Sequence, residues 1–290
     1  MKNKKINRNS KIMAAFIGLI CLVMTACGNA GEKDPSSEAV DQSVISGKIQ
    51  IAGSTSVQPL SEELAKAFME KNSGLTIHVA GGGSGAGIKA AENKTADIGA
   101  SSRELKSEEK SVKEVIIALD GIAVIVHKDN PLEDLPKEDI KKIFLGEMTD
   151  WAQVGNMSGP IRVYTREEGS GTRGAFEELI LGKDAVGKEL KIIETANVQN
   201  STGAVRTAVA GDKNGIGYIS IGSLNDEIKA VKVDKISATV ENVKAGTYGI
   251  SRPFIYMTKD EPSGAVKAYI EWVLSAEGQE LVAKSFIPIN

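Results

Sequence analysis

Three short turns of the chain combine glycine with hydroxyl side chains, and each one precedes a predicted helix. They lie at residues 53–56 (GSTS), 81–87 (GGGSGAG) and 166–172 (REEGSGT). A helix N-terminus presents unpaired backbone N–H groups, and glycine lets a ligand approach those groups closely. Serine and threonine add hydroxyl donors without adding charge. This pattern is typical of anion binding.

Charge balance indicates what kind of anion three such turns can hold. Each helix N-terminus carries about half a positive charge, so three of them supply roughly +1.5. Arg166 adds a full charge and a planar set of donors. Together these groups can balance a dianion. A single turn of this type is usually an ordinary helix cap, so the prediction depends on the three turns meeting at one place.

Other chemistries compete for the same residues. The run at 81–87 contains a loose dinucleotide fingerprint, but no acidic residue stands at a clear strand end about twenty residues later. It also lacks the Lys-Ser/Thr of a phosphate-binding P-loop. Ser84 or Ser170 could be the nucleophile of a secreted hydrolase, but neither has a nearby base in the sequence. The chain has only His78 and His127, which disfavours a catalytic triad or a histidine metal site.

Composition excludes several other classes. The 290 residues are 41% hydrophobic, 25% charged and 4% aromatic, which fits a globular chain and neither a disordered nor a collagen-like one. The formal charge is −3, and the first 26 residues contribute +5, which leaves −8 for the rest. A body this acidic is a poor general binder of nucleic acid or anionic membrane. We therefore expect a small, polar ligand.

The elements that position these turns follow an α/β pattern of short strand, turn and helix. We expect strands at 47–52, 75–80 and 96–100, with helices after the first two. Two long apolar segments, 115–127 and 248–258, are interpreted as crossings between domains. The sequence thus predicts a discontinuous domain I, built from 47–124 and 250–290, and a domain II at 125–249. A helix starting at Ser263 has one apolar face, which we expect to pack on domain I.

The N-terminus has the features of an export signal. A basic segment precedes the apolar stretch 12–26, which is too short for a comfortable membrane span. Met24-Thr25-Ala26-Cys27 resembles a bacterial lipoprotein signal, which implies a signal peptide at 1–26 and lipidation of Cys27. Residues 27–46 then form a flexible tether. The alternative is a secreted protein in which Cys27 has no role.

The motifs together resemble the phosphate-binding lipoproteins of ABC phosphate importers. The resemblance rests on GSTSVQPL at 53–60, GGGSGAGI at 81–88, DIGASSREL at 97–105, IFLGEMTDWAQVG at 143–155 and REEGSGT at 166–172. It implies a two-domain periplasmic-binding-protein fold of type II, the Venus-flytrap fold, with two hinge crossings. It also implies high-affinity phosphate binding between the domains and delivery to the permease subunits with their ATPase. We expect a monomer, lipid-anchored at the extracytoplasmic face of the cell membrane, with no enzymatic activity and no cofactor.

The resemblance assigns the site residues one by one. The candidate phosphate-binding residues are Ser54, Thr55, Ser56, Ser84, Ser102, Arg166, Ser170, Gly171 and Thr172. Many relatives have aspartate where this chain has Ser102, and that carboxylate accepts the proton of phosphate. Sulfate brings no proton, so a carboxylate repels it, whereas a serine hydroxyl can donate as well as accept. We therefore expect softer rejection of sulfate, and a receptor for another oxyanion such as sulfate or molybdate stays open as an alternative.

Three further features allow two interpretations each. Arg103 is either a second cation of the site or the partner of a nearby acid such as Glu104. Residues 200–203 (NSTG) form either a fourth set of donors or a plain helix cap. Asp97 either orients Ser84 or an amide, or caps a turn.

Overall fold

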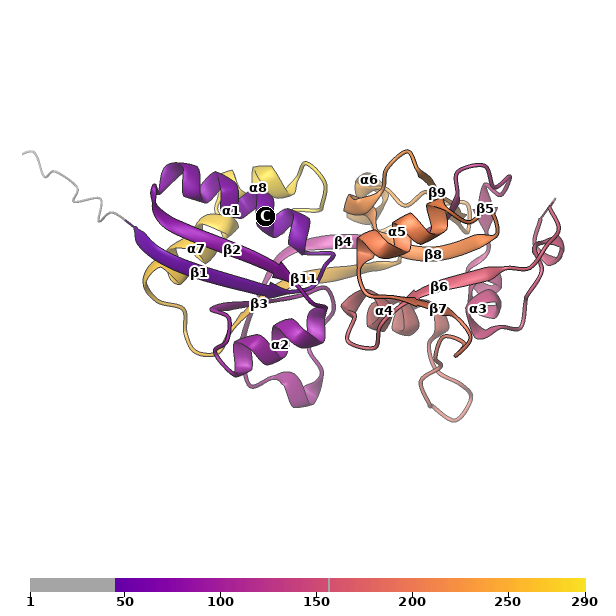
Figure 1. The fold of residues 1–290 in the computed structure, drawn as a ribbon, viewed down its shortest axis with the longest axis horizontal. Helices are drawn as coiled ribbons and strands as arrows, with labels where there is room; N and C mark the ends of the chain where they lie inside the picture. The colour runs from indigo at the N-terminus through magenta and orange to yellow at the C-terminus, as the bar shows by residue number, and fades with distance from the viewer. Residues whose placement is uncertain (1–44, 156) are drawn as a thin grey trace, which may run out of the picture. The chain divides into compact units, whose positions relative to one another are not determined.

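The structure, a computed structural model, describes residues 45–155 and 157–290. The predicted signal peptide, Cys27 and nearly all of the predicted tether lie outside these residues. Strands and helices alternate along the described chain (Figure 1), so the predicted α/β class is confirmed. The strands are β1 (Ser46–Gly53), β2 (Gly74–Gly81), β3 (Ile98–Ser101), β4 (Lys113–His127), β5 (Asp134–Leu135), β6 (Arg162–Arg166), β7 (Asn197–Gln199), β8 (Gly215–Ser220), β9 (Ile228–Ala230), β10 (Lys232–Val233) and β11 (Ser251–Thr258).

The helices fall mostly where apolar residues recur at helical spacing. In α1 the buried Leu60, Leu64 and Phe68 are four residues apart, and a proline occupies its first turn. The helices are α1 (Gln58–Lys71), α2 (Ser84–Glu92), α3 (Lys137–Leu145), α4 (Gly171–Phe176), α5 (Thr202–Ala210), α6 (Val240–Lys244), α7 (Gly264–Leu274) and α8 (Ala276–Val282). Short 3₁₀ turns are η1 (Ser107–Glu109), η2 (Trp151–Gln153) and η4 (Ile221–Ser223), and α4 continues as the π-helical turn η3 (Glu177–Leu181).

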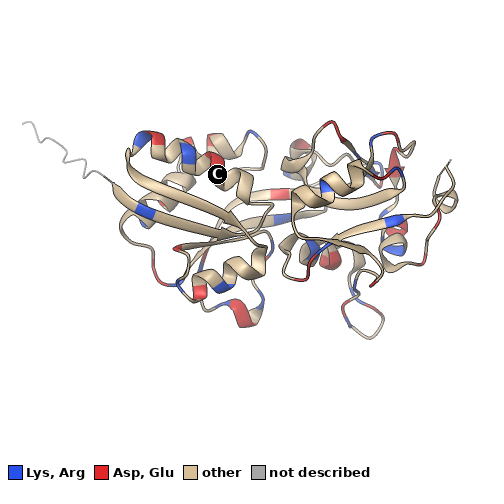
Figure 2. Cartoon of the chain, viewed as in Figure 1, with Lys and Arg blue, Asp and Glu red and all other residues tan. Residues whose placement is uncertain are grey.

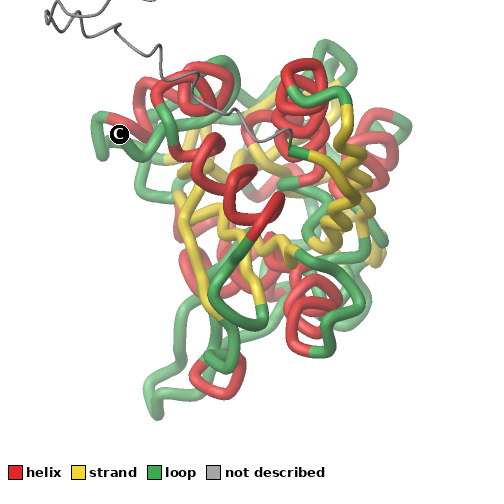
Figure 3. Tube along the Cα trace, turned by 90° about the vertical axis from the view of Figure 1, so that its left-hand side faces the viewer, coloured by secondary structure: helices red, strands yellow, loops and turns green. Residues whose placement is uncertain are grey.

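One sheet runs through the described chain in the order β2-β1-β3-β11-β4-β8-β6-β7, and β9 also pairs with β4. β1 is parallel to β2 and β3, whereas β11 is antiparallel to β3 and β4. The part of β4 up to Gly121 pairs with β11, and the part from Ile122 pairs with β8 and β9. β4 therefore belongs to both ends of the sheet. Helices lie on both faces of the strands (Figure 3).

Two main hydrophobic cores lie within the described residues, and they define what we call the first and second halves. The core of the first half is formed by β1, α1, α7 and the later part of β11. That of the second half is formed by the later part of β4 with α3, α5 and β8. Phe254 belongs to the first core, while Ile250, just before β11, belongs to the second. Both segments predicted as crossings thus contribute to both cores; the domain boundaries themselves stay a prediction.

The helix expected from Ser263 is α7. Its buried Tyr269, Ile270 and Val273 pack into the first core, as predicted. None of the helices in the described part of the chain has the length and apolar character that a bilayer crossing requires.

Candidate functional site

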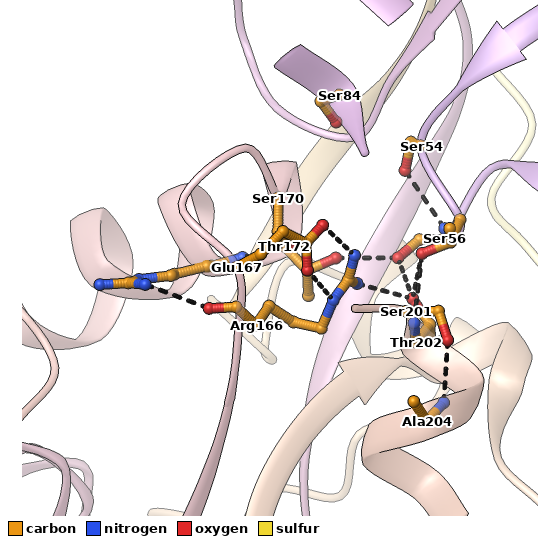
Figure 4. A network of polar contacts seen from close by, with 12 residues as sticks. Ser54, Ser56, Ser84, Arg166, Glu167, Ser170, Thr172, Ser201, Thr202 and Ala204 are labelled. Atoms are coloured by element: carbon orange, nitrogen blue, oxygen red, sulfur yellow. Dashed lines mark hydrogen bonds and ion pairs between the residues drawn. The ribbon is translucent and has the colours of Figure 1, made fainter. Parts of the chain in front are cut away.

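The three turns converge where the two halves meet. The first turn follows β1, the second leads into α2, and the third connects β6 to α4. Ser56 Oγ shares hydrogen bonds of 2.8 Å with Thr172 Oγ1 of the third turn and with Thr202 Oγ1 at the start of α5 (Figure 4). The backbone N–H of Gly85 donates to the carbonyl of Gly169 over 2.9 Å. Groups predicted from separate stretches of sequence therefore touch.

Ser102 connects the first two turns. Ser54 Oγ donates to Ser102 Oγ over 2.8 Å, and the backbone N–H of Ser102 donates to Ser84 Oγ over 3.0 Å. All three serines are buried. Gly171 lies against the same group, because a Cβ at this position would stand 2.2 Å from Ser84 Oγ and 2.7 Å from Ser102 Oγ. Only glycine allows α4 to approach these hydroxyls so closely.

Arg166 supplies the positive charge of the cluster. It is the last residue of β6 and is 1% exposed. Its Nε and Nη2 donate to the carboxylate of Glu167 over 2.9 and 2.8 Å, and its Nη1 donates to Thr202 Oγ1 over 3.1 Å. Glu167 thus fixes the guanidinium while Nη1 reaches the hydroxyl cluster. Burial raises the pKa of Tyr218 far above its ordinary value, so the phenol that contacts Thr165 and the Arg166 amide stays neutral.

The remaining candidates accept hydrogen bonds from backbone N–H groups or donate their own. Ser170 is buried and caps α4, since its Oγ accepts from the backbone N–H of Arg173 over 3.2 Å. Thr55 is partly exposed, and its Oγ1 accepts from the backbone N–H of Thr202. The backbone N–H of Ser56 donates to Ser54 Oγ over 3.2 Å.

The segment 200–203 serves both purposes weighed from the sequence. Ser201 caps α5 by accepting from the backbone N–H of Ala204 over 3.0 Å. Thr202 joins the cluster, with contacts to Thr55, Ser56 and Arg166. The hydroxyl-glycine composition of this segment was the signal that pointed to Thr202, which is not among the nine candidates.

Two other residues take the structural role. Arg103 forms a two-pronged ion pair with Glu109, with N···O distances of 2.7 and 2.8 Å. Asp97 accepts from the backbone N–H of Gln50 over 2.8 Å and makes no hydrogen bond to Ser84. Neither side chain forms a hydrogen bond with the cluster.

A cavity of about 540 Å³ lies beside the cluster, between charged side chains of both halves. Ser170 is the only one of the nine candidates that lines it. Two arginines of its wall, Arg103 and Arg173, are already paired with Glu109 and Glu177. Apart from Ser170, the convergent hydroxyl groups therefore lie outside this cavity. Within residues 45–155 and 157–290, no group of His, Cys, Asp and Glu side chains could hold a metal ion.

Comparisons with known proteins agree with this architecture. The model of the PBP superfamily domain matches residues 34–277. The phosphate-binding protein PstS of Bacillus subtilis is 28% identical, covering 98% of this chain and 96% of its own. A crystal structure from Clostridium perfringens, described as a phosphate ABC transporter substrate-binding protein with bound phosphate, is 42% identical with a TM-score of 0.79. It covers 84% of this chain and 100% of its own.

A second solved structure is an ABC-type phosphate transport receptor from Vibrio cholerae. It is 33% identical with a TM-score of 0.68, covering 83% of this chain and 100% of its own. The mixed α/β fold of this chain is thus the fold of these solute-binding proteins, as the sequence predicted. The chain belongs to the PBP superfamily and, within it, to the family of PstS-type phosphate-binding proteins.

Proposed function

We propose that this chain binds inorganic phosphate at the convergent hydroxyl cluster and delivers it to the permease of an ABC phosphate importer. The observation that carries the proposal is the buried Arg166, whose Nη1 donates to Thr202 Oγ1, which in turn shares a hydrogen bond with Ser56 of the first half. A guanidinium surrounded by neutral donors matches a small dianion in charge and in hydrogen-bonding capacity. The relatives named for phosphate support the same ligand.

The mechanism we propose is a shift between open and closed states. Phosphate first meets the donors of domain I (47–124 and 250–290), and domain II (125–249) then brings Arg166 against it. Because Arg166 gains its contacts only on closure, phosphate favours the closed state. The hydrogen bonds of Ser56 to Thr172 and Thr202 mark the surfaces that would meet.

We also propose where the protein acts. A signal peptide at 1–26 directs export, lipidated Cys27 anchors the chain at the extracytoplasmic face of the cell membrane, and residues 27–46 act as a tether. The folded part acts as a monomer and passes phosphate to the permease subunits and their ATPase.

The chain acts as a receptor and not as an enzyme in this proposal. Among the described residues, Ser84 Oγ forms hydrogen bonds only with Ser102, and Ser170 Oγ caps α4. A serine nucleophile needs a base within hydrogen-bond reach, and no His or Lys side chain contacts either hydroxyl in this part of the chain. We therefore expect no turnover of phosphate esters.

Isothermal calorimetry of the purified protein tests the proposal. We expect phosphate to bind with a stoichiometry of one, with weaker binding of sulfate and molybdate. The same protein incubated with p-nitrophenyl phosphate should release no product. If sulfate or molybdate binds and phosphate does not, the ligand is wrong; steady release of nitrophenol would make the chain an enzyme.

A further inference from the structure

A second arginine is buried near the cluster, in an ion pair with Asp120. Arg252 is the second residue of β11 and Asp120 lies opposite it on β4. Nε and Nη2 of Arg252 donate to Asp120 Oδ2 over 3.1 and 2.9 Å, and the two side chains are 2% and 0% exposed. Figure 2 shows oppositely charged bands where β4 and β11 run side by side.

Strand order and register place this pair between the two strands that lead to Ser102 and Arg166. β11 is antiparallel to β3, and Ile255 lies opposite Ser101, the last residue of β3. Arg252 therefore lies beyond the end of β3, on the side where the chain continues to Ser102. On the other side, Ser220 Oγ donates to Asp120 Oδ1 over 2.8 Å, and β8, which ends at Ser220, runs parallel to β6, which ends at Arg166. The pair therefore lies between the strand ends that carry Ser102 and Arg166.

The hydrogen bonding of the pair is unequal. Both carboxylate oxygens of Asp120 have partners, since Oδ2 accepts from Arg252 and Oδ1 accepts from Ser220. Arg252 is not, because its Nη1 is buried and has no hydrogen-bond partner among the described residues. A buried guanidinium nitrogen without a partner is costly, so a role beyond pairing with Asp120 is required to explain it.

The charges around Arg252 favour an anion close to it. The charged and titratable groups that act on it are Asp120 from β4, Arg166 from β6 and Tyr218 from β8, and Tyr218 is neutral. Burial lowers the pKa of Arg252, and the nearby positive charge of Arg166 lowers it further, while Asp120 acts in the opposite direction. Two arginines that repel each other are both stabilised by a dianion held close to them.

We propose that Arg252 is a second cation of the phosphate site, held by Asp120, whose charge strengthens binding of the dianion. This inference rests on the proposed function. Arg252 acts on the ligand through its electric field and does not have to touch it. Its field adds to that of Arg166 in a part of the molecule where water screens little. Asp120 offsets part of the charge of Arg252, so Arg252 adds to the charge of Arg166 and does not replace it.

Charge-keeping and charge-removing variants distinguish this role from a purely structural one. In R252K the positive charge remains, so phosphate affinity by calorimetry should fall by less than about threefold. In R252Q the charge is lost, and affinity should fall by more than about tenfold. R162Q is the matched control, because Arg162 also pairs with an aspartate, Asp212, but is half-exposed; its affinity should equal that of the wild type.

Thermal unfolding shows whether each variant is folded at the temperature of the titration. If R252Q does not fold, the double variant D120N/R252Q removes both buried charges together, and it should fold and bind phosphate several-fold more weakly than the wild type. Equal losses in R252K and R252Q would show a structural role and overturn the inference, as would wild-type affinity in folded R252Q or in the folded double variant. Absence of phosphate binding in the wild type would instead overturn the proposed function.

Discussion

The two halves of the molecule supply different chemistry to the same site. The first half contributes the neutral hydroxyls of Ser54, Ser56, Ser84 and Ser102, all buried near the starts of α1 and α2. The second half contributes Arg166 together with Glu167, which fixes it. In the proposed site, hydroxyl donors thus come mainly from the first half, and the arginine nearest to them comes from the second half.

The first half has an arginine next to Ser102 in the sequence, but its guanidinium pairs with a carboxylate outside the hydroxyl cluster. Arg103 directly follows Ser102, yet its guanidinium is bound to Glu109 and to the backbone carbonyl of Glu104. The ion pair keeps this charge away from the cluster. The carboxylate of Glu109 therefore explains why Arg103 makes no hydrogen bond to the hydroxyl cluster.

The largest effect is expected from removing the charge of the second half. R166A leaves a buried dianion without the cation nearest to it and leaves Glu167 unpaired, so phosphate affinity by calorimetry should fall by more than about a hundredfold. R162A removes an arginine from the same strand, but its partner is Asp212 and its affinity should stay within about twofold of the wild type. Wild-type affinity in R166A would refute the comparison.

The double variant R166A/E167Q separates two causes of this loss. It removes the carboxylate that R166A leaves unpaired next to the site. If the repulsion by Glu167 contributes, the double variant should bind phosphate more tightly than R166A while staying far weaker than the wild type.

The next effect concerns selectivity in the first half. S102D places a carboxylate among Ser54, Ser84 and the ligand, where it can accept the proton of phosphate but only repels sulfate. We expect the ratio of phosphate to sulfate affinity, measured by competition, to rise by about tenfold. Equal exclusion of sulfate by the two proteins would remove Ser102 from the argument.

A smaller loss is expected where the halves touch. T202V keeps the shape of Thr202 but removes the hydroxyl that contacts Ser56, Thr55 and Arg166. Phosphate affinity should fall by about fivefold, the effect of losing about 1 kcal/mol of hydrogen bonding. T207V makes the same change at an exposed position of the same helix and serves as the control. No difference between the two variants would reduce Thr202 to a packing residue.

The smallest effect is expected from E109Q, which tests how Arg103 is held. The hydrogen bond from Arg103 lowers the pKa of Glu109 below its ordinary 4.5, so this stabilisation is complete above that value and is lost as the pH falls through the lower folded-state pKa. E109Q should therefore lower the unfolding free energy at neutral pH by about 1 kcal/mol or less, and the difference should be smaller at an acid pH below 4.5. Thermal unfolding at both pH values measures it, with E108Q as the exposed control. A difference that persists in acid would contradict the ion-pair explanation.

Short-range sequence patterns were sufficient to predict several helices and strands and most of the residues of the candidate site. Apolar spacing predicted α1 and α7, and the residue types of 47–52 predicted β1, in which buried and exposed residues then alternate in the structure. The hydroxyl-glycine turns were visible because helix starts and close backbone approach demand particular residue types within a few positions. Such constraints act between near neighbours, so they are written in short stretches of the chain.

Contacts between distant residues were decided only when the chain folded. Asp120 and Arg252 are 132 residues apart, and nothing in the sequence around either one pairs them. In the same way Thr202 meets Ser56, which is 146 residues away in the sequence. Hydroxyl and charged side chains have many partners that would satisfy them, and the packing of the sheet and its helices decides which of those partners comes within reach.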